Sequence, residues 1–225
     1  MNNNKPKILV FASGSKEGGG SGFENLVSAS RSGSMTADIV GVVSNHEQGG
    51  VRNRADRLQI PFIHFPKPWD AETYQRIASE SGADLFALSG WLKLVTGLDS
   101  KTRFNSRTVI NIHPGLLPEF GGAGLYGHYV HEAVISAYVR GEVTHSGVSM
   151  HFVTEEYYKG PIFFRCKVKI EENDTPESLG ARVNQAEHIY QPKITDMVAT
   201  GLIRWDGADP NSLQVPEGYS IESFA

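Results

Sequence analysis

The chain has 225 residues, of which 40% are hydrophobic and 20% charged, and its formal net charge is −4 at pH 7. This length suits one domain with a substantial core. The slight acidic excess offers no basic surface for a phosphate backbone, so nucleic acid is not an expected partner. The single cysteine, Cys166, excludes an intramolecular disulfide and suits a reducing compartment.

The N-terminal segment has an apolar run only from Ile8 to Ala12. A signal peptide needs a longer apolar core, and a membrane span needs about 20 residues. We therefore expect a cytoplasmic protein with no membrane partner.

Short apolar runs alternate with helical patterns over the first half of the chain. The predicted strands are Lys7–Ala12, Asp38–Val43, Phe62–Phe65, Leu85–Leu88 and Thr108–Ile112. The predicted helices are Phe23–Ser30, Gly50–Leu58 and Ala71–Ser81. Such alternation is typical of a doubly wound, mostly parallel α/β sheet.

The second half has a different pattern. A helix is predicted over Gly127–Val139, and a long antiparallel strand pair over Ser146–Val153 and Ile162–Ile170. A last helix begins within Asp174–Leu179 and continues to Ala199, with Pro192 expected to kink it. We expect residues 1–225 to form a single domain, with a loop-like tail over 208–225.

Asn111 and His113 lie two apart at the end of a predicted strand and directly before Pro114. If the strand continues, both side chains point to the same side, at the edge where parallel sheets bind ligands. An imidazole beside a carboxamide can polarise a carbonyl and stabilise a developing oxyanion. The alternative is an ordinary strand-end histidine whose hydrogen bonds are made by the backbone.

The stretch Gly14–Gly22, GSKEGGGSG, lies between the first strand and the first helix. Backbone amides at a helix N-terminus form an anion site, so phosphate is one expected ligand. The stretch matches neither a P-loop nor GxGxxG, and a plain surface loop is the alternative.

Glu187 lies on the last predicted helix and suits either a ligand contact or a solvated helix face. The histidines at positions 128, 131, 145 and 151 lack the neighbouring ligands that a metal site requires, so no metal is expected.

Several motifs, in this order, resemble those of the phosphoribosylglycinamide (glycinamide ribonucleotide) formyltransferases, a family within the folate-dependent formyltransferases. The resemblance extends from Lys7 to about Gly207. The matching segments are ILVFASGS, SNHEQGGVRNRADRLQIP, LSGWLKLV, VINIHPGLLPEFGGAGLYGHYVHEAV, SGVSMHFVTEEYYKGPI and RVNQAEHIYQP.

The resemblance implies a formyltransferase fold and transfer of a formyl group from 10-formyltetrahydrofolate to the amine of glycinamide ribonucleotide, in purine biosynthesis. It implies that Asn111 holds the formyl oxygen and that His113 is a proton donor and stabilises the tetrahedral intermediate. Glu187 would contact the ribonucleotide. The implied phosphate-binding residues are Gly20, Ser21 and Gly22; the implied folate-binding residues are Leu92, Lys93, Leu94, Val95, Asn111, Thr154 and Tyr158. Such an enzyme has two small-molecule substrates and is a monomer or a homodimer.

The sequence departs from the family in the glycine-rich loop and at the catalytic carboxylate. Residues 16–19 are an insertion, and Gly22 replaces an asparagine. Tyr158 occupies the position of the family's catalytic aspartate, for which Glu155 or Glu156 are possible substitutes. Two alternatives follow: a formyltransferase for another amine, such as an amino sugar nucleotide, or a catalytically impaired homologue that only binds ligands.

Overall fold

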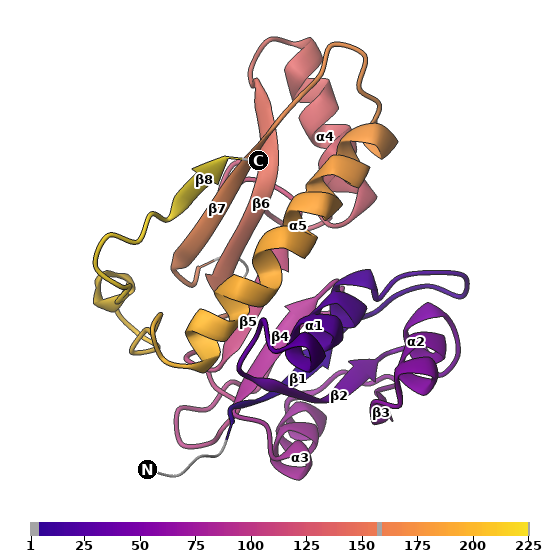
Figure 1. Cartoon of the computed structure of the whole chain (residues 1–225), viewed down its shortest axis with the longest axis vertical. Helices are drawn as coiled ribbons and strands as arrows, with labels where there is room; N and C mark the ends of the chain where they lie inside the picture. The colour runs from indigo at the N-terminus through magenta and orange to yellow at the C-terminus, as the bar shows by residue number, and fades with distance from the viewer. Residues whose placement is uncertain (1–4, 157–158, 225) are drawn as a thin grey trace.

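The computed structural model describes residues 5–156 and 159–224. Its centre is an eight-stranded sheet in the order β3-β2-β1-β4-β5-β6-β7-β8. Figure 1 shows the N-terminal strands in the lower half, with β6 and β7 extending upwards beside α4 and α5. The strands are β1 (Lys7–Phe11), β2 (Asp38–Ser44), β3 (Phe62–His64), β4 (Leu85–Ser89), β5 (Val109–His113), β6 (His145–Phe152), β7 (Ile162–Lys169) and β8 (Glu222–Phe224).

The first five strands are parallel, because helical crossovers connect most of them. Strand β6 then pairs antiparallel with both β5 and β7. This arrangement confirms the predicted mostly parallel α/β sheet with a long antiparallel pair in the C-terminal half. The helices are α1 (Ser21–Ser32), α2 (Gly50–Leu58), α3 (Ala71–Ser81), α4 (His128–Val139) and α5 (Pro176–Ala199).

Alternate residues of β1 belong to two separate cores. Ile8 and Val10 pack with residues from α1, α2, α4 and α5, whereas Leu9 and Phe11 pack with residues from α3. Successive side chains of a strand point to opposite faces, so both faces of this strand are covered. A strand buried on both faces reads as a continuous apolar run, which is the pattern KILVF.

The element boundaries differ from the predictions where the glycine-rich loop and the catalytic pair lie. Helix α1 begins at Ser21 rather than Phe23, directly after Gly20. Strand β5 continues to His113, so both polar residues of the NIHP segment belong to it. Both boundaries place candidate site residues on regular elements rather than on loops.

Helix α5 continues through Pro192 to Ala199, as predicted. Proline has no N–H, so the carbonyl of His188, four residues earlier, loses its helical partner. Asn25 of α1 supplies the replacement: its Nδ2 donates to the His188 carbonyl at 2.7 Å. The proline therefore does not break the helix, because the freed carbonyl is bonded to α1.

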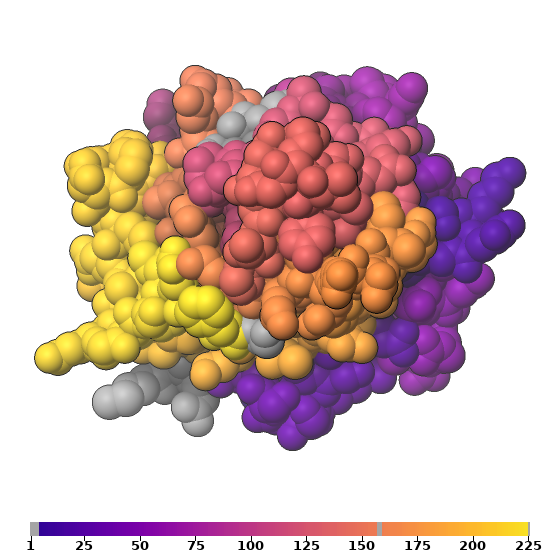
Figure 2. All heavy atoms as spheres, turned by 90° about the horizontal axis from the view of Figure 1, so that it is seen from above, coloured from indigo at the N-terminus to yellow at the C-terminus, as the bar shows by residue number. Residues whose placement is uncertain are grey.

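Residues 208–225, expected to be a loop-like tail, are structured in part. They contain a 3-10 turn at Pro210–Ser212 and the strand β8, which pairs parallel with β7. In Figure 2 the C-terminal segment (yellow) lies beside the β6–β7 region (orange), on the side away from the N-terminal half (indigo). The prediction was wrong here because this pairing depends on the neighbouring edge strand rather than on local apolar periodicity.

Candidate active site

A cavity of about 440 Å³ lies beyond the carboxyl ends of β4 and β5, between the start of α1 and α5. Its wall includes Gly20, Ser21 and Gly22 from the loop, and Asn111 and His113 from β5. The starts of α4 and α5 close its other end, through residues such as His128 and Glu177. The structure therefore brings the glycine-rich loop and the NIHP segment, which are far apart in the sequence, into one cavity.

Asn111 is held by a histidine on the next strand. In the β5–β6 register Asn111 lies opposite His151, and its Nδ2 is 3.1 Å from His151 Nε2. The other ring nitrogen of His151, Nδ1, donates to the carbonyl of Phe152 at 2.8 Å. Since Nδ1 carries the proton, Nε2 accepts from the Asn111 amide, and this pairing orients the amide.

His113 is buried and bonded to the loop that follows β5. Its Nε2 donates to the Phe120 carbonyl at 2.8 Å. Ser149, opposite His113 in the β5–β6 register, fastens that loop: its hydroxyl donates to the Gly115 carbonyl and accepts from the Leu117 N–H. Each polar residue of β5 thus has a positioning residue opposite it on β6.

Burial makes both histidines weak bases. It lowers the pKa of His113 to about 4, although the hydrogen bond to the Phe120 carbonyl acts in the opposite direction. Burial likewise lowers the pKa of His151 to about 4. Desolvation disfavours the charged form, so both rings are neutral near pH 7. With its proton on Nε2, His113 has Nδ1 as its basic nitrogen.

The glycine-rich loop ends in an open helix N-terminus. Gly20, the N-cap of α1, has a φ of 80° and no side chain that caps the helix. The N–H groups of the first helical turn therefore have no intrahelical acceptors. The residues that carry them line the cavity, and the positive end of the helix dipole lies there too. Such a terminus attracts an anion.

The inserted residues form a closed turn. Ser15 and Gly18 bond to each other through backbone and side chain, and the Ser15 carbonyl accepts from the N–H of Gly50 at 3.0 Å. A Cβ on Gly50 would lie 2.2 Å from the Gly18 carbonyl oxygen, so only glycine allows this approach. The insertion thus packs against the start of α2.

Glu187 of α5 lines the same cavity and accepts a hydrogen bond from Asn184 Nδ2 at 3.2 Å. Burial raises its pKa to about 7, while the Asn184 hydrogen bond acts in the opposite direction. Near neutral pH this carboxyl therefore exchanges between an acceptor-only carboxylate and a protonated form that can also donate.

A second, smaller cavity of about 80 Å³ adjoins the first, and Asn111 lines both. The second cavity is lined by Lys93, Leu94, Val95 and Thr154, all predicted folate-binding residues. The remaining predicted residue of the loop after β4, Leu92, lines the larger cavity instead.

The two candidate substitute carboxylates are placed differently. Glu156 lines the second cavity together with Asn111 and His151. Glu155 is turned towards the loop after β4, where its Oε1 accepts from the Gly97 N–H at 3.0 Å. Tyr158 lies outside the described residues.

His151, Ser149 and Gln191 lie at the candidate site, but the sequence did not predict a role for them there. The signal for the first two is their spacing: Ser149 and His151 alternate on β6 as Asn111 and His113 do on β5. Recognising it requires the register of an antiparallel pair. Within residues 5–156 and 159–224, no group of three His, Cys, Asp or Glu side chains could hold a metal ion, and no helix is long and apolar enough to cross a membrane.

Comparison with known proteins defines the class of protein. A family model described as formyl transferase matches residues 6–195, which include strands β1 to β7, the glycine-rich loop, both cavities and most of α5. The chain accordingly has the fold of a formyl transferase and belongs to that class of protein.

Relatives narrow the family further. The chain is 36% identical to the chloroplastic phosphoribosylglycinamide formyltransferase of Arabidopsis thaliana, over 89% of this chain and 68% of that protein. It is 32% identical to the phosphoribosylglycinamide formyltransferase of Bacillus subtilis, over 84% of this chain and 92% of that one. The crystal structure of the Anaplasma phagocytophilum enzyme of the same name matches 99% of both chains, with a TM-score of 0.80 and 27% identity. The chain belongs to the phosphoribosylglycinamide formyltransferase family.

Proposed function

We propose that this enzyme transfers the formyl group of 10-formyltetrahydrofolate to the primary amine of glycinamide ribonucleotide, a step of purine biosynthesis. The observation that carries the proposal is the position of Asn111 in the wall shared by two cavities. A transfer between two substrates requires that the donated group and the accepting amine meet at one point. Asn111 is that point.

The larger cavity suits the ribonucleotide. Its phosphate would lie at the open N-terminus of α1, where Gly20, Ser21 and Gly22 present backbone amides. Glu187 lies on the same wall and is suited to accept hydrogen bonds from ribose hydroxyls. The glycinamide arm would then extend to His113 and Asn111.

The smaller cavity suits one part of the folate. Leu94 and Val95 supply apolar contacts, and Lys93 supplies a positive charge that suits the acidic end of a folate. The loop that carries them is held by buried aromatic side chains: Trp91 Nε1 donates to the Tyr74 hydroxyl at 2.8 Å, and that hydroxyl lies 3.1 Å from the Leu94 carbonyl.

The chemistry proceeds through a tetrahedral intermediate. The amine nitrogen of the acceptor bonds to the formyl carbon while the carbonyl electron pair moves onto oxygen. The Asn111 Nδ2 donates its second hydrogen to that oxygen, since its first is directed to His151. When the carbonyl reforms, the bond between the formyl carbon and N10 of the folate breaks, and N10 takes up a proton.

His113 moves the proton in this scheme. The neutral ring accepts the proton of the attacking amine at Nδ1, since Nε2 already donates to Phe120. The imidazolium so formed stabilises the oxyanion and then donates its proton to N10. His113 therefore acts first as a base and only then as the proton donor that the family resemblance implies. Burial keeps its ring uncharged in the free enzyme.

Of the two candidate substitutes, Glu156 is the one that we assign to the role of the family's catalytic aspartate. It lines the cavity that contains Asn111, whereas Glu155 is bonded to the Gly97 N–H. We expect Glu156→Gln to lower kcat at least about tenfold, within the range that proton-transfer groups contribute. Glu155→Gln serves as the matched control with a small effect, and equal effects of the two changes would contradict the assignment.

The test of the proposed function is a transfer assay with both substrates, in which formylated ribonucleotide is detected by mass spectrometry and tetrahydrofolate by absorbance. Wild type should form both products in equal amounts, and Asn111→Ala should be about 10²–10³-fold slower. Asn53→Ala, on the exposed surface of α2, is the control. An amino sugar nucleotide tested in parallel addresses the alternative acceptor, which none of these relatives favours. Absence of transfer to glycinamide ribonucleotide would refute the proposal.

A further inference from the structure

Gln191 is a buried amide in the wall of the larger cavity with no role in the reaction described above. It is 2% exposed, and its Oε1 accepts from the Ser89 hydroxyl at 3.3 Å. The described part of the chain contains no acceptor for the hydrogens of its Nε2. Because Gln191 lines the cavity, an N–H of its amide group is suited to donate to a ligand there.

The carboxamide lies against the first turn of α1. A Cβ on Gly22 would be 2.3 Å from Ser89 Oγ and 3.0 Å from Gln191 Oε1. No side chain can occupy position 22 while these two groups stay where they are. A side chain at position 22 would therefore displace the Ser89 hydroxyl of β4 and press on the Gln191 amide of α5.

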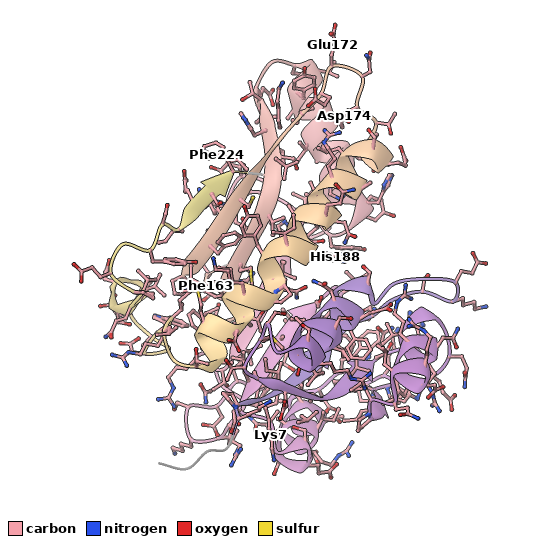
Figure 3. The ribbon with its side chains drawn as sticks, viewed as in Figure 1. Lys7, Phe163, Glu172, Asp174, His188 and Phe224 are labelled. Carbon is pink, nitrogen blue, oxygen red and sulfur yellow. The ribbon has the colours of Figure 1, made fainter. Side chains whose placement is uncertain are left out.

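The same region of α5 is fixed on α1. Asn25 of α1 donates to the His188 carbonyl, which Pro192 leaves without a helical partner. Figure 3 shows His188 on the part of α5 that faces α1. The segment of α5 that carries Gln191 is thus hydrogen-bonded to α1.

We propose that Gln191 donates its Nε2–H to the phosphate of the acceptor at the N-terminus of α1. It supplies from α5 the side-chain amide that the family carries at the position of Gly22. This inference rests on the proposed function, because the anion is taken to be the ribonucleotide phosphate. Asparagine at position 22 and the Ser89–Gln191 pair are alternative ways to meet one requirement, because a Cβ at position 22 would displace the Ser89 hydroxyl that bonds Gln191.

The experiment is a kinetic comparison of Gln191→Leu with Gln185→Leu, an exposed control on the same helix. Gln191→Leu should raise KM for glycinamide ribonucleotide about tenfold or more, as expected when a hydrogen bond to a charged group is lost. Its kcat and its KM for the formyl-folate should stay close to wild type. Inorganic phosphate, used as a competing inhibitor, should bind wild type correspondingly more tightly than the variant.

A rescue variant separates binding from packing. Gly22→Asn combined with Ser89→Ala and Gln191→Leu restores a side-chain amide from the α1 side and should recover most of the lost affinity for phosphate. If Gln191→Leu proves unstable in a thermal melt, Gln191→Glu, which keeps the shape and adds a negative charge, should raise the inhibition constant of phosphate.

Unchanged KM and unchanged phosphate inhibition in folded Gln191 variants would overturn the inference, provided that wild type forms product. If wild type itself forms no product, the proposed function fails instead, and phosphate binding measured by calorimetry still tests Gln191.

Discussion

Asn111 on β5 and His151 on β6 lie directly opposite each other in the sheet, and the Asn111 carboxamide donates to His151 Nε2 at 3.1 Å. His151 can accept this hydrogen bond because its own proton is on Nδ1, bonded to the Phe152 carbonyl. An amide rotates freely about its last bond unless a partner fixes it. His151 therefore determines which edge of Asn111 faces the substrate.

Replacing His151 with leucine should lower kcat about tenfold to a hundredfold with little change in either KM. The Asn111 amide would remain but would no longer be held in the productive orientation, which weakens its hydrogen bond to the developing oxyanion. Steady-state kinetics with both substrates measure this. His145→Leu, at the other end of β6 from the site, is the control. An unaltered kcat in His151→Leu would show that other contacts orient Asn111.

The buried histidines should also make the enzyme sensitive to acid. The pKa of His113 and that of His151 are about 4 in the fold, below the ordinary value of 6.5. The unfolded chain therefore binds more protons than the folded chain between these values, and the free energy of unfolding falls as the pH is lowered from about 6.5 to about 4. Urea unfolding at a series of pH values measures the slope.

His113→Gln should flatten that slope, because the substituted residue does not titrate. The loss for one such histidine is on the order of 1–3 kcal/mol across the window. Exposed His64→Gln is the control. An equal slope in His113→Gln and wild type would mean that His113 is charged in the fold, contrary to its burial.

The apolar runs predicted much of this structure because their cause is local. ILVF of β1 and LFALS of β4 are buried on both faces, and such strands read as continuous hydrophobic segments. The place of the candidate site could be predicted for the same reason. Asn111 and His113 lie at the end of such a run, and parallel strands direct their carboxyl ends to one edge of the sheet.

Residues whose role depends on a partner far away in the sequence could not be predicted. His151 acts through the register of β6 against β5, and β8 forms only because β7 offers it an edge. The position of Pro192 within α5 was predicted, but the sequence of the helix does not reveal that Asn25 bonds the carbonyl that the proline frees. In each case a tertiary contact decides the outcome.

Glu187 should give the affinity for the ribonucleotide a pH dependence centred near 7. Its pKa is raised to about 7 by burial, so the carboxylate that accepts ribose hydroxyls forms only as the pH rises through this value. KM for the ribonucleotide should therefore fall between about pH 6 and pH 8 in wild type. Glu187→Gln should have a higher KM at pH 8 and no such trend.

The same change should stabilise the free enzyme at high pH. When folding raises the pKa of a carboxyl group, the free energy of unfolding falls as the pH rises from the unfolded pKa to the folded one. Glutamine carries no charge to bury, so the variant avoids this loss. Thermal melts of wild type and Glu187→Gln at pH 5 and pH 8 measure this difference in stability. Exposed Glu172→Gln provides the comparison (Figure 3). A variant less stable than wild type at pH 8 would contradict the assignment of Glu187 as a desolvated acid.

Asn25 and Pro192 should be energetically coupled through the His188 carbonyl. Asn25→Ala leaves that part-buried carbonyl without its partner from α1, which costs on the order of 1 kcal/mol. In a Pro192→Ala background, residue 192 regains an N–H that bonds the carbonyl within the helix, so Asn25→Ala should cost much less there. Urea unfolding of wild type, both single variants and the double variant gives the coupling energy directly. Additive effects would mean that Asn25 stabilises α1 against α5 by packing alone, and that the continuity of α5 through Pro192 has another cause.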